Sequence, residues 1–144
     1  MSAEPPLHYH PYQTEDFTIL EGELTVLIHG KKMHLHKGDH LQVDPNTVHA
    51  MWNASAKETK VNWKISPALN SEHLFETFTG LANDRKTDAS GRPAFLQAIL
   101  LLKKFSTEFR MAKPAYAVMK IICAVLAPIA RMRGYKENLV EYID

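Results

Sequence analysis

The sequence predicts a mainly β fold, a barrel or sandwich of short strands over residues 1–66, followed by a helical extension of about three helices over residues 67–144. In the first stretch apolar and polar residues alternate between frequent turn residues, which is typical of all-β sandwiches and barrels. After Ser66 and Pro67 the apolar residues recur every three or four positions, as on one face of a helix. At 144 residues, one compact core is expected, at most two small ones.

Each predicted strand presents one face that is almost entirely apolar. Turns are expected at Gly22, Gly30–Lys31 and Gly38, because glycine accepts the backbone conformations of tight turns. The residues expected to face inward along the strands are Glu15, Phe17, Ile19, Leu24, Val26, Ile28, Met33, Leu35, Leu41, Val43, Val61, Trp63 and Ile65.

Three helices are expected in the extension. Ser71 is a candidate N-cap for the first, and a polar loop over residues 83–92 separates it from the second. Proline suits the first turn of a helix, so Pro93 and Pro114 are placed to open the second and third, and Pro128 is expected to kink the third. The predicted helices run from Ser71 to about Ala82, from Pro93 to about Phe109 and from Pro114 to about Met132.

Four residues in the β region have the chemistry of a metal site. His8 and His10 are one residue apart and therefore share a face of a strand. Glu15 and His49 arrive from later strands, and three imidazoles with one carboxylate suit a divalent transition metal, Fe(II), Mn(II), Ni(II) or Zn(II). The site contains no thiolate, which excludes a sulfur-rich structural zinc site.

The spacing of these residues resembles the two motifs of the cupin superfamily. The first motif reads HxH, three or four residues, Glu, six residues, Gly. Here four residues separate His10 from Glu15, and six separate Glu15 from Gly22.

The second cupin motif reads Gly, a short run, PxGxxH, three residues, Asn. Gly38, His49 and Asn53 fit it, with three residues between His49 and Asn53. Asp44 stands where the motif has Pro and Asn46 where it has Gly. Because Asn tolerates the left-handed conformation, the turn is expected to be kept.

The resemblance covers roughly residues 5–66, and the helical tail is similar to that of some small bacterial cupins. It implies a jelly-roll-like β-barrel whose inner face carries the metal ligands. It also implies a metal-dependent enzyme acting on a small organic substrate, with dioxygenase-type chemistry as the leading interpretation. The alternative is a non-catalytic cupin module that binds or senses a small ligand. The residues that would carry out catalysis are not assigned.

Three further residues are candidates for lining the pocket. Gln13 is close enough in sequence to contact a metal ligand or donate a hydrogen bond into the pocket, although it is equally suited to a surface turn. Met51 lies on the face of His49, and Trp63 is expected inside the barrel. Both are candidate pocket walls, and both are also residue types that fill ordinary cores.

The chain contains a second HxH pair, His34 and His36. A hairpin turn at Gly30–Lys31 places them opposite Met33 and Leu35, so they are expected to point out of the barrel. His29 and His40 lie nearby, and the alternative reading is a second metal site on the outside. His73 is expected at the surface of the first helix.

The charge of the chain is unevenly distributed. Residues 101–136 hold eight Lys or Arg against one acid, Glu108, although the net charge of the whole chain is +1. The simpler interpretation is a solvated helix face, and the alternative is a basic amphipathic surface for anionic lipid or an acidic partner. The apolar run around Lys120 is shorter than the roughly 18 residues of a transmembrane helix. No nucleic-acid-binding motif is found.

A cytoplasmic homodimer is expected. Residues 1–7 show no apolar stretch of a signal peptide, and the single Cys123 cannot form an internal disulfide. Only seven residues precede His8, where cupin barrels usually carry another strand, so uncovered strand edges favour association. In that dimer the basic stretch Lys103–Lys136 is expected on the rim of the interface. The residues expected to be buried there are Ile121, Ile122 and Val125.

Overall fold

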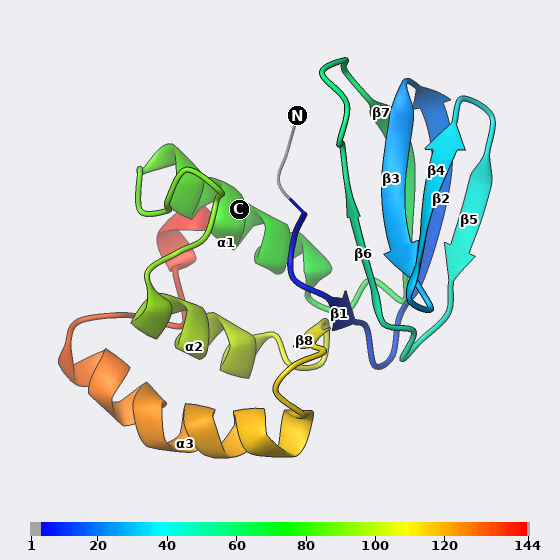
Figure 1. Ribbon diagram of the computed structural model, residues 1–144. Coiled ribbons are helices and arrows are strands. Elements are labelled where there is room, and N and C mark those ends of the chain that lie inside the picture. The colour runs from blue at the N-terminus through cyan, green and yellow to red at the C-terminus, as the bar shows by residue number, and fades with distance from the viewer. Residues whose placement is uncertain (1–3, 144) are drawn as a thin grey trace.

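The structure, a computed structural model that describes residues 4–143, has two parts that lie side by side (Figure 1). One part is a sandwich of antiparallel strands, and the other is a stack of helices. The strands are β1 (His8–Tyr9), β2 (Thr14–Glu21), β3 (Glu23–Ile28), β4 (Lys31–His36), β5 (His40–Val43), β6 (His49–Trp52), β7 (Lys60–Ser66) and β8 (Arg110–Met111). The strand order is β4-β3-β6-β1-β8 in the first sheet and β5-β2-β7 in the second.

The predicted fold class is confirmed, because seven short strands stacked in two sheets precede the first of three α-helices, and β8 lies between the last two. Within residues 4–143 no strand pair joins one sheet to the other, so the barrel is open. Apolar side chains from β2, β3, β4 and β5 fill the space between the sheets. The buried members of this core are Phe17, Ile19, Leu24, Val26, Ile28, Leu35 and Val43.

Gly22 lets the chain cross from one sheet to the other between β2 and β3. Its φ is +78°, and a Cβ there would lie 2.3 Å from the carbonyl oxygen of Glu58. Any larger residue would therefore combine backbone strain with a clash. The hydroxyl of Thr59 donates to the carbonyl of Glu23 at 2.7 Å and ties the same loop to the start of β3.

The hairpin between β3 and β4 turns one residue earlier than predicted. The turn residues are His29 and Gly30, both with positive φ, and Ile28 pairs with Lys31. Positive φ at both central residues gives the twist that a two-residue hairpin needs. The correction leaves every side chain on its predicted face, but Met33 is half-exposed because β4 lies at the edge of its sheet.

The helices are α1 (Ser71–Asn83), α2 (Phe95–Lys104) and α3 (Tyr116–Met132), followed by a 3-10 turn, η1 (Val140–Tyr142). Ser71 is the first residue of α1 and not its N-cap, which is Asn70, and the Ser71 hydroxyl accepts a hydrogen bond from the Gln13 amide. The second helix ends at Lys104, well before Phe109, because Phe105 turns inward and is buried. None of the described helices is long and apolar enough to cross a membrane.

After α2 the chain returns to the sandwich as β8 and pairs with β1. His8 lies opposite Met111, and the Ala112 N–H donates to the Leu7 carbonyl at 2.9 Å. The helical region therefore supplies a strand to the first sheet. Contrary to expectation, this edge of β1 is covered within one chain, and the homodimer stays a prediction.

Candidate metal centre

The structure brings the four predicted ligands together between the two sheets. His8 pairs directly with His49 across β1 and β6, and Glu15 comes from β2 in the facing sheet. The three histidines each offer a ring nitrogen within 4.8 Å of the others. Oε2 of Glu15 lies 3.2 Å from Nε2 of His10 and 2.9 Å from Nε2 of His49.

The loop before β6 positions His49 relative to His10. Asn46 adopts a left-handed conformation, φ +64°, as expected for the residue standing at the motif's Gly. Its N–H donates to the His10 carbonyl at 2.8 Å, and its side-chain amide donates to the Pro11 carbonyl at 3.3 Å. These contacts hold the two ligand-bearing segments against each other.

Backbone carbonyls orient all three imidazoles. Nδ1 of His49 donates to the Thr47 carbonyl at 2.8 Å, Nδ1 of His10 to the Glu108 carbonyl at 2.7 Å, and Nδ1 of His8 to the Pro6 carbonyl at 3.3 Å. A carbonyl oxygen can only accept, so the Nδ1 atoms carry the protons. In the neutral rings, Nε2 then presents a lone pair, which is the tautomer that a metal requires.

The centre of the site contains buried acceptors that lack hydrogen-bond partners. They are Nε2 of His10, Nε2 of His49 and Oε2 of Glu15. Glu15 and His49 are almost completely inaccessible to solvent. Buried acceptors that face one another at about 3 Å are unfavourable unless a cation lies between them. The donor set therefore fits a divalent transition metal ion.

The site shifts the pKa of its ionisable groups. Burial, and then the charges of His49 and His10, lower the pKa of His8 to about 4. Burial acts to raise the pKa of the Glu15 carboxyl, but the close contact with His49 and the nearby imidazoles outweigh it and lower that pKa. Burial acts to lower the pKa of His49, yet Glu15 and the Thr47 carbonyl raise it.

Trp63 holds the carboxylate of Glu15. Its indole Nε1–H donates to Oε1 of Glu15 at 3.1 Å, which leaves Oε2 facing the histidines. The ring stacks on Phe17 at 5.6 Å and meets Phe75 of α1 edge-on at 5.0 Å. Trp63 is itself 44% exposed, although the carboxylate that it holds is buried. The sequence indicated an inward side chain for Trp63 but not this hydrogen bond.

The other two pocket candidates lie farther from the centre of the arrangement. Gln13 is buried, and its amide nitrogen donates to the carbonyls of Pro67 and Ala68 and to Ser71, so it anchors the start of α1. Its carbonyl oxygen has no hydrogen-bond partner. Met51 is half-buried and packs against the apolar core between the sheets.

Glu108 is a functional residue that sequence reasoning missed. Its backbone carbonyl orients His10, and its buried carboxylate accepts hydrogen bonds from the N–H and side-chain amide of Asn70 at 3.2 and 3.1 Å. The Thr107 hydroxyl donates to the same carboxylate at 2.8 Å. The sequence feature that could have pointed to Glu108 is that it is the single acid in the basic stretch 101–136.

The second HxH pair lies outside the sandwich, as predicted. His34 and His36 are exposed, and their Nδ1 atoms lie 2.9 and 3.6 Å from the carboxylate of Glu23. His29 and His40 are also exposed, and none of these four joins the inner site.

Comparisons with known proteins find a matching family model and several similar proteins. Residues 2–64 match the family model described as "Cupin domain". The chain is 40% identical over 70 residues to quercetin 2,3-dioxygenase of Bacillus subtilis, covering 49% of this chain and 20% of that protein. It is 32% identical over 89 residues to an oxidoreductase of Arthrobotrys oligospora, covering 56% of this chain and 35% of that protein. The chain thus spans between a fifth and about a third of these relatives.

A solved structure shows a partial likeness. A cupin protein from Bacteroides fragilis is 28% identical, with a TM-score of 0.40, over 46% of this chain and 59% of the other.

Proposed function

We propose that this chain is a metal-dependent enzyme acting on a small organic substrate. The premise is that it belongs to the cupin superfamily through residues 2–64. The ligands are His8, His10, Glu15 and His49. The observation that carries the proposal is the cluster of buried acceptors, which have no hydrogen-bond partners but face one another at distances suited to a shared cation. Similarity to a dioxygenase and to oxidoreductases favours dioxygenase-type or related chemistry.

A bound transition metal with open positions would supply a place where dioxygen or a chelating substrate is polarised. The protein contributes orientation and charge. Glu15 balances part of the ion's charge, and Trp63 keeps the carboxylate turned toward the histidines. The carbonyls of Thr47 and Glu108 hold His49 and His10 in the metal-binding tautomer.

Aromatic side chains beside the ligands favour a planar, largely apolar substrate. Trp63 and Phe75 meet edge-on next to Glu15, and both rings are partly exposed. Rings of this kind stack on flat substrates and exclude water from the reacting groups. The relative that acts on quercetin makes this flavonol the first substrate to test.

The chain offers a matched pair of variants for the test, because it contains two HxH pairs. The double variant His8→Ala with His10→Ala removes inner ligands, and His34→Ala with His36→Ala removes the outer pair. We expect about one metal ion per chain in the wild type and in the outer variant, and none in the inner variant, by elemental analysis after reconstitution with Fe(II), Mn(II), Ni(II) or Zn(II). A wild type without metal, or equal loss in both variants, would contradict the proposed site.

Oxygen consumption then separates catalysis from binding. With reconstituted protein and quercetin, we expect uptake of oxygen that the inner variant lacks and the outer variant retains. Metal binding without turnover of any flavonol or catechol would favour the alternative, a non-catalytic module that binds or senses a small ligand.

A further inference from the structure

The outer face of α3 is apolar and largely exposed. Its opposite face, with Cys123, Ala127 and Ala130, is buried. Spacings of three and four residues place the exposed apolar side chains in one stripe along the helix. We call this the α3 stripe, and its members are Val118 (47% exposed), Ile121 (66%), Val125 (61%), Ile129 (43%) and Met132 (88%).

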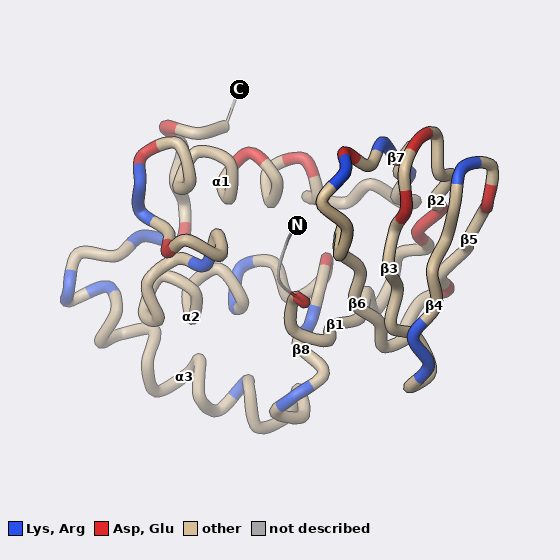
Figure 2. The backbone as a smooth tube through the Cα atoms, turned by 45° about the horizontal axis from the view of Figure 1, so that its top comes forward, with Lys and Arg blue, Asp and Glu red and all other residues tan. Residues whose placement is uncertain are grey.

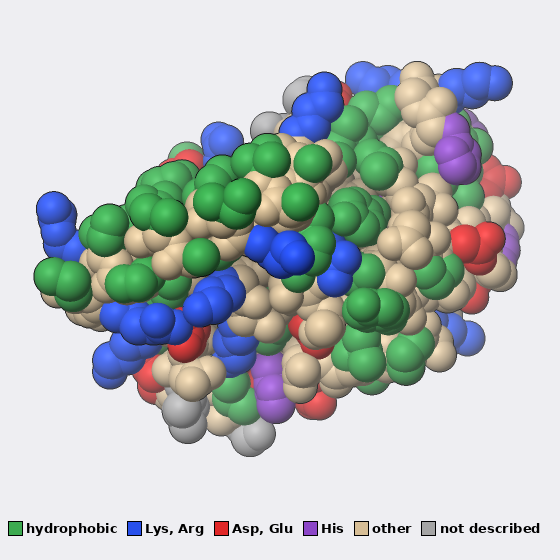
Figure 3. All heavy atoms as spheres, turned by 90° about the horizontal axis from the view of Figure 1, so that it is seen from below, with side chains coloured by type: hydrophobic (Ala, Val, Ile, Leu, Met, Phe, Trp, Pro, Cys, Tyr) green, Lys and Arg blue, Asp and Glu red, His purple; other side chains and the backbone are tan. Residues whose placement is uncertain are grey.

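Basic residues surround the α3 stripe. Residues 101–136 hold eight of the chain's 17 Lys and Arg but one of its 16 Asp and Glu, so this stretch carries +7 and the rest of the chain −6. The one acid, Glu108, is buried and bonded to Asn70. In Figure 2 the acidic residues lie mostly on α1 and the sandwich, away from α3. Figure 3 looks onto α3 and shows a band of hydrophobic side chains bordered by Lys and Arg.

We propose that α3 binds the surface of an anionic lipid bilayer. The α3 stripe would enter the boundary between headgroups and acyl chains, and the basic residues would meet the lipid phosphates. A helix with one apolar face and basic flanks lies in the plane of such an interface. Its 17 residues make it about 25 Å long, and it is too short and too charged at its ends to cross.

Charge favours the bilayer over a second copy of the chain. A two-fold contact through the α3 stripe would bring the same patch of each copy together, and with it two basic borders. The nearest acid in sequence after α3, Glu137, already pairs with Arg131 at 2.7 Å. A self-complementary interface of this kind would suffer like-charge repulsion, whereas anionic lipid matches both the apolar stripe and the charge.

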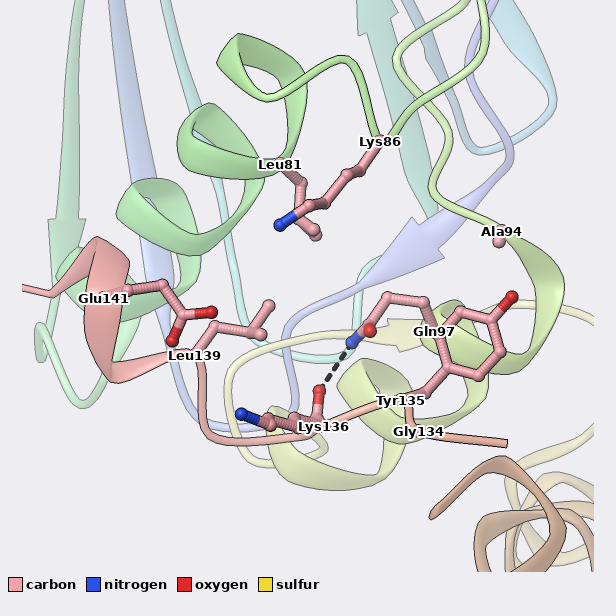
Figure 4. Close-up of a pocket in the computed structure, with 9 residues that line it drawn as sticks. All are labelled: Leu81, Lys86, Ala94, Gln97, Gly134, Tyr135, Lys136, Leu139 and Glu141. Atoms are coloured by element: carbon pink, nitrogen blue, oxygen red, sulfur yellow. Dashed lines mark hydrogen bonds between the residues drawn. The ribbon is translucent and has the colours of Figure 1, made fainter. Parts of the chain in front are cut away.

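The cavity shown in Figure 4 does not compete for this role. It has a volume of about 500 Å³ and lies between α1, α2 and the C-terminal segment, away from the α3 stripe. Gln97 spans part of it by donating to the Lys136 carbonyl at 2.7 Å. Its lining mixes apolar residues with two lysines, Gln97 and Glu141, and includes no member of the α3 stripe.

Vesicle co-sedimentation tests the proposal with the full-length chain. We expect binding to vesicles of equal phosphatidylcholine and phosphatidylserine, weaker binding as salt rises, and little binding to phosphatidylcholine alone. The variant Ile121→Asp with Val125→Asp should lower the affinity at least tenfold. The matched control is Leu20→Asp with Val48→Asp, two exposed apolar residues of the β region, and it should bind as the wild type does. Equal binding of all three proteins, or no binding by the wild type, would overturn the proposal.

A charge variant and a mass measurement complete the test. Lys113→Gln with Arg133→Gln removes one exposed cation near each end of α3 and should weaken binding to the mixed vesicles about thirtyfold, at about 1 kcal/mol per basic residue. Light scattering at micromolar concentration tests whether a second copy of the chain, and not lipid, covers the α3 stripe. If the wild type does not bind vesicles but forms a dimer, and Ile121→Asp dissociates that dimer, the α3 stripe would be assigned to contact with a second copy of the chain. Metal-free protein should bind vesicles equally well, so failure here is distinguishable from failure of the proposed enzyme activity.

Discussion

The β region and the helical region each orient one inner histidine of the candidate metal centre, but they do so differently. His49 is held by the Thr47 carbonyl, two residues away on the approach to β6. His10 is held by the Glu108 carbonyl, 98 residues away, from the segment between α2 and β8. One half of the site is therefore built locally, whereas the other half exists only when the helices are in place. The helical extension therefore contributes to the support of the candidate site.

The two regions also have separate cores. Phe17 lies at the centre of the apolar core between the sheets, and Phe105 lies in a core formed by α1, α2 and the C-terminal segment. The regions meet through the pairing of β1 with β8 and through Gln13 with Ser71. Whether these contacts join the two cores into one folding unit can be tested directly.

The largest expected effect is on stability, when a large side chain is removed from one core and the unfolding of the other region is followed. Phe105→Ala should lower the free energy of unfolding by about 3–5 kcal/mol, because its ring is fully buried. Both tryptophans, Trp52 and Trp63, lie in the β region, so their fluorescence reports mainly on that region, with a contribution from the contact of Trp63 with Phe75 of α1. Because β8 joins β1, we expect the urea midpoints from fluorescence and from far-ultraviolet circular dichroism to fall together. Phe17→Ala is the reciprocal control, and an unchanged fluorescence midpoint in Phe105→Ala would show that the regions unfold independently.

A smaller effect is expected where the helical region supports His10. Glu108→Ala leaves the N–H and amide of Asn70 without their acceptor and lets the segment that carries the Glu108 carbonyl move. We expect a loss of about 1–3 kcal/mol in stability and about 10–100-fold in metal affinity, measured by calorimetric titration. Thr47→Ala retains the carbonyl that orients His49 and should leave the affinity nearly unchanged. Unaltered affinity in Glu108→Ala would mean that the β region alone organises the ligands.

Trp63→Phe tests the local support of Glu15 within the β region. The change keeps an aromatic ring against Phe17 but removes the N–H that Glu15 accepts. Because the ring is partly exposed, stability should change by less than about 1 kcal/mol, while metal affinity falls about tenfold. The comparison variant is Trp52→Phe, because the Trp52 ring lies beneath Lys32, 5.1 Å from its Nζ, and not against Glu15. Equal affinities in the two variants would argue against the positioning role of Trp63.

The smallest effect concerns the contact between α1 and the C-terminal segment. A Cβ on Gly80 would lie 2.3 Å from Cγ of Tyr142, so Gly80→Ala should displace that ring and cost about 1 kcal/mol, measured as a shift in thermal midpoint. In a Tyr142→Ala background the clash disappears. There the same substitution should stabilise α1 by up to about 1 kcal/mol, because Ala is the better helix former. If Gly80→Ala changes the thermal midpoint in the same direction in both backgrounds, the contact between Gly80 and Tyr142 does not determine its effect.

Much of the β region and of the site could be predicted from the sequence alone. Alternation along a strand and the spacing between neighbouring strands are local properties, so His8, His10, Glu15 and His49 could be named without a structure, and the outer position of His34 followed from the same reasoning. The left-handed Asn46 was also predictable, because its conformation depends on its own side chain and on the turn.

The tertiary structure alone decided the contacts between segments far apart in the chain. Periodicity extended the second helix to Phe109, whereas burial of Phe105 and the pairing of β8 with β1 end it earlier. The Glu108 carbonyl reaches His10 only because that strand pairing exists. For α3, the sequence showed an apolar helix with basic flanks but not which face the rest of the chain covers. Local patterns depend on neighbouring residues, while the choice of partner for each face depends on the sum of contacts over the whole fold.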